Sequence, residues 1–151
     1  MKLEKEPVTY IWDIESDGLL HQMTRIHCLN IRRYETGEVW RFRYNSVENT
    51  IWEGVQMLLE ADFLVGQNIL HFDIPALELI FGPLDFKGKI RDTLVLTRVI
   101  FSDQKDKDFR LYEKGLLPGK CIGGNRLEDW GQRLGLLKAT IRKNVRLKPK
   151  N

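Results

Sequence analysis

The sequence has few cysteines and no long apolar run. Its two cysteines, Cys28 and Cys121, lie far apart and outside any Cys-x-x-Cys or paired-histidine pattern. The sequence therefore predicts neither a disulfide scaffold nor a zinc site. The apolar run from Ile74 to Phe81 is interrupted by Pro75 and Glu78 and falls short of the roughly 20 residues that a membrane-spanning helix needs. The N-terminus is charged and lacks the apolar stretch of a secretory signal. We therefore expect an intracellular protein with no membrane segment.

The positive net charge of the chain comes from its C-terminal end. The 151 residues include 24 Lys and Arg and 21 Asp and Glu; six of the basic residues lie in 138–151, which leaves 18 basic and 21 acidic residues in 1–137. A basic arm beside a mildly acidic body is typical of nucleic-acid binders, because cations on an arm neutralise backbone phosphates. A solvated tail is the simpler interpretation. We predict one domain over 1–137 and a basic tail over 138–151.

The expected elements follow the order of an α/β fold. Strands are predicted at residues 8–13, 25–34 and 38–44, and the last two flank a turn at Glu35-Thr36-Gly37. The next elements are a helix with Ile51, Val55, Leu58 and Leu59 on its apolar face, a strand at 63–65, a helix at about 74–80 and a strand at 89–92. Ser46 or Asn49 is the expected cap of the first of these helices.

The C-terminal third of the chain is expected to be helical with one long loop. Asp92 can cap a helix that runs through Ile100. Residues 102–110 are predicted to form a solvated loop because of their charged side chains Asp103, Lys105, Asp106, Lys107 and Asp108. A last amphipathic helix is predicted from the spacing of Leu127, Trp130, Leu134 and Leu137.

Two acidic residues follow the apolar start of the first strand. Asp13 and Glu15 are two residues apart, so both side chains point to one face of the strand while Ile14 turns into the core. Two like charges set close together repel, and that cost is usually tolerated where a cation sits between them. A hard divalent ion such as Mg²⁺ or Mn²⁺ would fit; an exposed strand end is the structural alternative.

A second polar segment, Asn68 to Asp73, lies between a short strand and a helix. Asp73 can serve as the N-cap of that helix. Alternatively, it lies over the carboxyl ends of the strands, where open α/β sheets place their sites, and faces Asp13 and Glu15. Three carboxylates from separate segments could hold two metal ions about 3.5–4 Å apart, which activate water and stabilise the leaving oxygen in phosphodiester hydrolysis.

These segments resemble the motifs of the DEDD, or DnaQ-like, 3′–5′ exonucleases. Asp13-Ile14-Glu15 is similar to the first exonuclease motif and Asn68 through Asp73 to the second. Residues 92–98, 117–120 and 127–135 resemble, in order, segments of the proofreading domain of family A DNA polymerases from short-tailed bacteriophages. The resemblance covers about residues 8–138.

The resemblance implies a ribonuclease-H-like exonuclease fold with a mixed sheet, in which three antiparallel strands are followed by parallel strands and helices flank the sheet. It also implies two divalent metal ions, Mg²⁺ or Mn²⁺, and a DNA 3′ end or single-stranded DNA as the substrate. The implied catalytic residues and metal ligands are Asp13, Glu15 and Asp73, and the implied substrate-binding residues are Asn68, Phe72 and Ile14. Asp92 and His71 are secondary candidates, for which a helix cap and a local hydrogen bond are the alternatives.

The sequence departs from the family after Leu137. The family's third motif pairs a Tyr with an Asp four residues later, or a His with an Asp five residues later. Here the last tyrosine is Tyr112 and the last carboxylate is Asp129.

We therefore expect a C-terminally truncated domain that acts as a proofreading-like, metal-dependent exonuclease on DNA 3′ ends, with activity reduced or lost without the third motif. The alternative is a catalytically silent relative, or a fragment of a split polymerase, that binds single-stranded DNA or a polymerase chain. The resemblance implies a phage-encoded protein in the bacterial cytoplasm.

Overall fold

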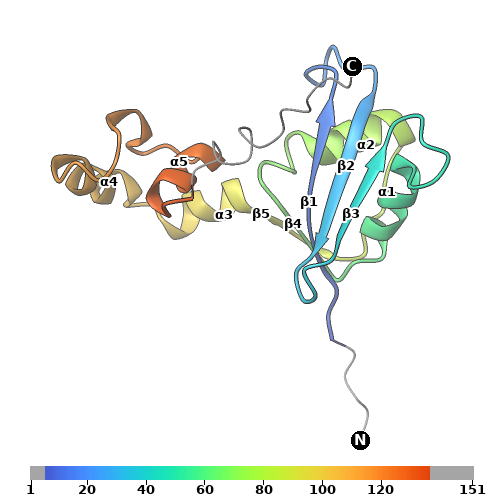
Figure 1. Cartoon of the computed structure of the whole chain (residues 1–151), viewed down its shortest axis with the longest axis horizontal. Coiled ribbons are helices and arrows are strands. Elements are labelled where there is room, and N and C mark those ends of the chain that lie inside the picture. The colour runs from blue at the N-terminus through green and yellow to red at the C-terminus, as the bar shows by residue number, and fades with distance from the viewer. Residues whose placement is uncertain (1–5, 137–151) are drawn as a thin grey trace, which may run out of the picture. The chain divides into compact units, whose positions relative to one another are not determined.

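The computed structural model describes residues 6–136, which form two compact units that divide after Val95 (Figure 1). The domain predicted over residues 1–137 thus comprises two units. The basic tail predicted at 138–151, and the predicted departure from the exonuclease pattern after Leu137, lie outside the described residues. No helix within residues 6–136 is long and apolar enough to cross a membrane.

The first unit is built on a five-stranded mixed sheet with the strand order β3-β2-β1-β4-β5. The strands are β1 (Thr9–Ser16), β2 (Ile26–Arg33), β3 (Val39–Arg43), β4 (Phe63–Gly66) and β5 (Lys89–Asp92). The first three strands are antiparallel, whereas β4 and β5 run parallel to β1. The predicted strand at 8–13 continues to Ser16, so Asp13 and Glu15 lie within its paired part. The predicted combination of antiparallel and parallel strands is confirmed.

One face of the sheet forms the hydrophobic core with two helices. In β1, Trp12 and Ile14 are buried while Ile11, Asp13 and Glu15 are exposed, as the two-residue period of a strand requires. Helices α1 (Ile51–Leu59) and α2 (Asp73–Phe81) contribute their buried side chains to the same cluster as the sheet. The core is therefore on one side of the sheet, and neither α1 nor α2 covers the opposite face, which carries Asp13 and Glu15.

Helix α1 begins with a capping box that differs from the predicted cap. Ser46 and Asn49 were the expected caps, but the N-cap is Thr50. The Thr50 Oγ1 accepts a hydrogen bond from the Glu53 N–H at 3.3 Å, and Glu53 Oε2 accepts one from the Thr50 N–H at 2.6 Å. The Thr-x-x-Glu pattern is the sequence signature of this motif, so the sequence contained the signal.

We expect Thr50→Ala to lower the free energy of unfolding of the first unit by about 1 kcal/mol, because it removes one half of the capping box. Urea denaturation followed by circular dichroism measures this loss. Ser46→Ala is the matched control, since Ser46 bonds within its own turn and does not cap the helix. Equal losses for the two variants would contradict the assignment of the cap.

The second unit is helical where the sequence predicted a loop. Helix α3 (Thr93–Ile100) crosses the division between the units and is followed by α4 (Gln104–Glu113), a 3₁₀ turn η1 (Gly119–Cys121) and α5 (Leu127–Arg133). The prediction of a solvated loop at 102–110 was therefore wrong. Its charges support a helix: Lys107 and Asp103 form an i,i+4 ion pair at 2.9 Å.

A buried ion pair explains why the charged segment folds as a helix. Asp108 is fully buried, and its carboxylate accepts two hydrogen bonds from the guanidinium of Arg133 on α5. Gln104 Nε2, one helical turn earlier, donates to the same carboxylate at 2.8 Å, as does the N–H of Gly123. Burial alone would raise the pKa of Asp108, but these donors hold it below its ordinary value. The partner of Asp108 lies 25 residues away in the chain, so the local pattern could not reveal it.

The last helix forms as predicted, but its buried side differs from the predicted apolar stripe. Leu127 and Leu134 are exposed, Trp130 is half-buried, and Leu137 lies outside the described residues. The buried residue of α5 is Asp129, which pairs with Arg126 at 2.8 Å. Ion pairs, in addition to apolar packing, therefore organise this small unit.

Candidate active site

The topology of the sheet brings the predicted site segments to one edge. Strands β1, β4 and β5 are parallel, so their carboxyl ends meet there. Asp13 and Glu15 lie in the second half of β1, residues 67–72 follow β4, and Asp92 is the last residue of β5. This edge is where open α/β sheets bind their ligands.

Asp13 and Glu15 are both exposed on the face of β1 that α1 and α2 leave uncovered. Ile14 between them is 5% exposed and packs in the core, as predicted. Its side chain is therefore directed away from the two carboxylates, and only its backbone can contact a ligand beside them. The Ile14 N–H donates a hydrogen bond to the buried Asp73.

Asp73 is a buried carboxylate rather than the helix cap. It is the first residue of α2, the N-cap residue is Phe72 without a side-chain hydrogen bond, and Asp73 Oδ1 accepts from the Ile14 N–H at 3.1 Å. The pKa of Asp73 is raised to about 6, mainly by burial and also by the nearby charge of Asp13, against the opposing hydrogen bond from the Ile14 N–H. The fold thus holds two carboxylates close enough to repel.

The donor chemistry of this site fits a hard divalent cation. Carboxylate oxygens are the ligands that Mg²⁺ and Mn²⁺ prefer, and a cation would relieve the repulsion that raises the pKa of Asp73. Within residues 6–136, however, no three Asp, Glu, His or Cys side chains are gathered closely enough to hold a metal ion as they stand. Asp13 and Glu15 are exposed, so their side chains can rotate toward a bound ion.

Asp92 connects the loop after β4 to the start of α3. Its Oδ1 accepts hydrogen bonds from the N–H groups of Asn68 at 3.0 Å and Leu94 at 2.8 Å, and its Oδ2 accepts one from Leu70 at 3.0 Å. The predicted helix cap is confirmed by the bond to Leu94. The contacts with Asn68 and Leu70 were not predicted, because they join segments more than 20 residues apart in sequence. Asp92 positions the loop that leads to Asp73.

We expect Asp92→Asn to lower the free energy of unfolding of the first unit by about 1–3 kcal/mol. In the variant, the amide nitrogen of Asn would face a backbone N–H, so that N–H would lose the carboxylate oxygen that accepts its hydrogen bond in the wild type. Differential scanning fluorimetry checks this loss. Asp62→Asn is a control, since Asp62 is exposed and its carboxylate accepts a single hydrogen bond within residues 6–136, from the N–H of Val8. An Asp92→Asn variant as stable as the wild type would contradict this role of Asp92.

The loop before α2 holds the remaining predicted residues. Asn68 has a left-handed backbone with φ of 63°, and its carbonyl accepts hydrogen bonds from the N–H groups of His71 and Phe72, each at 3.1 Å. His71 is exposed, whereas Phe72 is half-buried against the core. The left-handed conformation explains an Asn at position 68, since Asn tolerates it better than most residues.

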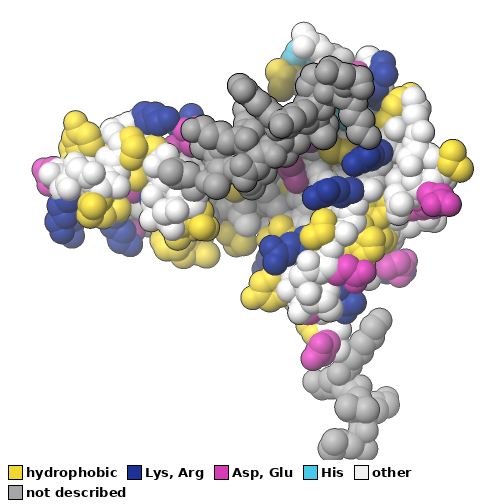
Figure 2. Space-filling view, in the orientation of Figure 1, with side chains coloured by type: hydrophobic (Ala, Val, Ile, Leu, Met, Phe, Trp, Pro, Cys, Tyr) yellow, Lys and Arg dark blue, Asp and Glu magenta, His cyan; other side chains and the backbone are white. Residues whose placement is uncertain are grey.

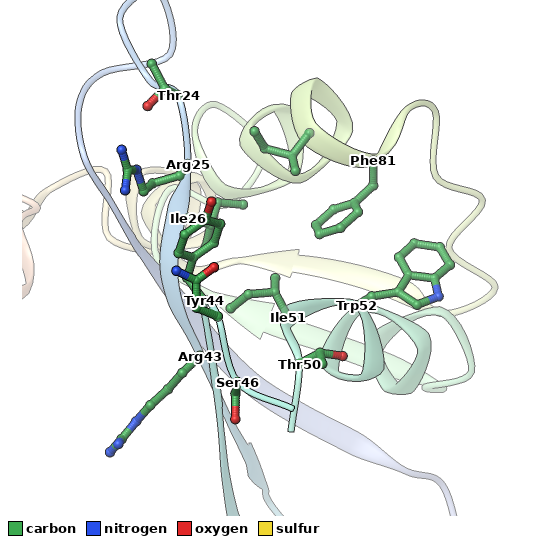
Figure 3. A pocket seen from close by; sticks show the side chains of 12 residues that line it. Thr24, Arg25, Ile26, Arg43, Tyr44, Ser46, Thr50, Ile51, Trp52 and Phe81 are labelled. Carbon is green, nitrogen blue, oxygen red and sulfur yellow. The ribbon is translucent and has the colours of Figure 1, made fainter. Parts of the chain in front are cut away.

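A pocket of about 270 Å³ lies in the first unit where the ends of β3 and α2 approach the start of α1 (Figure 3). Its lining is mainly apolar and includes Ile51, Trp52 and Phe81. The ring centroids of Trp52 and Phe81 are 5.3 Å apart. The guanidinium of Arg25 lies over the ring of Tyr44 at 5.5 Å. None of the predicted site residues lines this pocket, so the candidate site does not depend on it.

Comparison with known proteins gives relatives among phage DNA polymerases. No protein-family model matches the chain. The DNA-directed DNA polymerases of Escherichia phage T7 and Enterobacteria phage T3 are each 35% identical to it over 133 residues, which span 83% of this chain and 19% of the polymerase. The chain therefore spans about a fifth of the length of these relatives.

A solved structure supports the same fold. The zinc-bound complex of Escherichia coli ExoI with single-stranded DNA superposes with a TM-score of 0.56 and 13% identity, over 93% of this chain and 42% of that chain. The chain is thus related in sequence to phage DNA polymerases and shares the fold of ExoI. The predicted ribonuclease-H-like fold is thereby confirmed, and the sequence relatives are the phage polymerases that the sequence pattern indicated.

Proposed function

We propose that this exonuclease domain removes nucleotides from DNA 3′ ends in a divalent-metal-dependent reaction, in the cytoplasm of a bacterial host. The observation that carries the proposal is the juxtaposition of Asp13 with the buried Asp73 at the carboxyl edge of the sheet. Glu15 lies on the same face of β1 as Asp13. The proposal is supported by the relationship to phage DNA polymerases and by the single strand that ExoI binds in its solved structure.

In this proposal Asp13, Glu15 and Asp73 hold two ions, Mg²⁺ or Mn²⁺. The ions would supply an activated water and neutralise the charge of the phosphodiester. The chain's own contribution is preorganisation: the N–H of Ile14 fixes the carboxylate of Asp73. The loop residues Asn68 and Phe72 would position the terminal nucleotide over these carboxylates.

The direct test uses the purified 151-residue chain and a 5′-labelled single strand in Mg²⁺ or Mn²⁺. We expect a ladder of products shortened from the 3′ end, and no products in EDTA. Asp13→Ala is expected to abolish the ladder, because one fewer carboxylate leaves the metal site incomplete. Asp85→Ala, which removes an exposed acid from the loop after α2, is the matched control and should retain full activity. An intact strand with both metals would overturn the proposal for this chain.

A second candidate is a catalytically silent module that binds single-stranded DNA or a polymerase chain. The sequence observation behind it is that no Asp, Glu, His or Tyr follows Asp129 within the 151 residues. Asp129 itself is buried in an ion pair with Arg126, so it is not available as a further metal ligand. Retention of a labelled strand without degradation would favour this candidate, and complementation by an added polymerase chain would identify the partner.

A further inference from the structure

The face of the sheet that carries Asp13 and Glu15 also carries a pair of arginines on β3. The residues of β3 alternate, with Trp40 and Phe42 directed to the core side and Arg41 and Arg43 exposed. Basic side chains are visible over the strands of this unit in the space-filling view (Figure 2). These arginines were not among the predicted site residues, although their alternation with Trp40 and Phe42 places both of them on one face of the strand.

The strand register aligns these arginines with the acidic pair. Asp13 is paired with Asn30, and Asn30 with Arg41; Glu15 is paired with Cys28, and Cys28 with Arg43. Each arginine is therefore level with one acid and two strands away, or about 10 Å at the usual strand spacing. The residues between them are uncharged and contact each other, with Asn30 Nδ2 3.6 Å from Cys28 Sγ.

The opposite edge of the sheet offers a comparison. Lys89 and Arg91 on β5 are also exposed and also two strands from β1, but they are level with Thr9 and Ile11. They therefore lie farther from the carboxyl edge than Arg41 and Arg43. The guanidinium of Arg91 also lies over the ring of Phe63 at 5.7 Å, so part of its cationic surface faces a neighbour.

Arg41 and Arg43 have the spacing and the available charge to bind phosphates. Within residues 6–136 neither arginine forms an ion pair. Alternate residues of a strand are about 6.6 Å apart, which is comparable to the separation of neighbouring phosphates in an extended single strand. Guanidinium groups bind phosphate oxygens in a bidentate fashion.

We propose that Arg41 and Arg43 are positioning residues that bind two successive phosphates upstream of the scissile bond. The single strand then crosses β2 and β3 on its way to Asp13 and Glu15, and does not cross β4 and β5. This inference rests on the proposed function, because it takes the 3′ end to lie at the acidic pair.

The first experiment compares two double variants by fluorescence anisotropy with labelled oligothymidylate, with Ca²⁺ in place of Mg²⁺. Arg41→Gln with Arg43→Gln should weaken binding about tenfold and reduce the slope of log K against log salt by about 1.4, since each phosphate contact on a single strand contributes about 0.7. Lys89→Gln with Arg91→Gln removes the same charge from the same face and should bind nearly as the wild type does. Equal weakening by both variants, or greater weakening by the β5 variant, would overturn the proposal.

The second experiment separates positioning from chemistry. With Mn²⁺, the Arg41 and Arg43 double variant should have a KM for an oligonucleotide about tenfold above the wild-type value, with little change in kcat. The same variant should hydrolyse an aryl ester of thymidine 5′-phosphate at the wild-type rate, because that small substrate has no upstream phosphates. A fall in the rate with the small ester would overturn the positioning role. If the wild-type chain hydrolyses neither substrate, the proposed nuclease function fails, whereas the anisotropy comparison still decides the path of the strand.

Discussion

Replacing Asp73 with Asn is expected to make the first unit more stable at neutral pH while removing the proposed nuclease activity. Asp73 is buried, and both burial and the charge of Asp13 oppose its ionisation. An Asn side chain keeps an oxygen that can accept the N–H of Ile14 and removes the buried charge. We expect a gain of about 2–3 kcal/mol at pH 7, from a pKa near 6 in the folded state compared with 3.8 in the unfolded state.

The same pKa shift fixes the pH dependence of this gain. A carboxyl whose pKa is raised by folding binds its proton more tightly in the folded state, so the stability of the wild type falls as the pH rises from about 4 to about 6. Asp73→Asn removes this fall. The difference in unfolding free energy should therefore be small near pH 4, grow through this window and stay constant above pH 7, as measured by urea denaturation in EDTA.

Asp92→Asn is the matched control for the stability effect, because Asp92 is equally buried but accepts four backbone hydrogen bonds. The two substitutions should change stability in opposite directions. The activity of Asp73→Asn should fall by at least about a thousandfold, or about 4 kcal/mol of transition-state stabilisation. A less stable Asp73→Asn variant at pH 7 would show that its carboxylate is held by favourable contacts, contrary to this account.

Arg133→Met is expected to destabilise the second unit by about 3–5 kcal/mol, because it leaves the carboxylate of Asp108 buried without its counter-charge. The Arg133 guanidinium also donates to the carbonyl oxygens of Cys121 at 3.0 Å and Gly124 at 2.7 Å. Its removal therefore affects α4, η1 and α5 together. Hydrogen exchange of peptides from these elements, read by mass spectrometry, should show loss of protection in the second unit.

Two further variants test whether the loss of protection comes from the buried charge of Asp108. Lys120→Met breaks the exposed ion pair with Glu128, which has an N–O distance of 2.8 Å, and should cost less than about 1 kcal/mol. Asp108→Asn combined with Arg133→Met should recover part of the loss, since no buried charge remains. Unchanged exchange in Arg133→Met would mean that the second unit does not depend on this ion pair.

The sequence predicted the order of the strands and helices in the first unit because its core follows simple periodicities. The alternation of Trp12 and Ile14 with Asp13 and Glu15 gives the buried and exposed faces of β1 directly. The stripe that includes Ile51, Val55 and Leu58 does the same for α1. Such patterns are local, and the apolar residues they place inward need no specific partner.

The second unit was less predictable because its buried residues are charged. Asp108 and Asp129 are fully buried, and a sequence gives no local sign that an acid will find an arginine. In the first unit, Thr50 was missed as the cap even though its capping-box pattern was present. The burial of these acids could not be predicted because their ion pairs form only in the folded structure, whereas the cap at Thr50 could have been predicted from its Thr-x-x-Glu pattern.

The sequence by itself determined the relationship to phage polymerases, the α/β order of the elements and the candidate acids, since motif spacing and apolar periodicity are properties of the chain. Only the tertiary structure decided that Asp73 is buried beside Asp13, that Asp92 holds the loop before α2, and that Arg41 and Arg43 are level with the acidic pair. These relationships depend on strand register and on contacts between distant segments. Neither is encoded in the local pattern of residues, because pairing partners are chosen by the packing of the whole sheet.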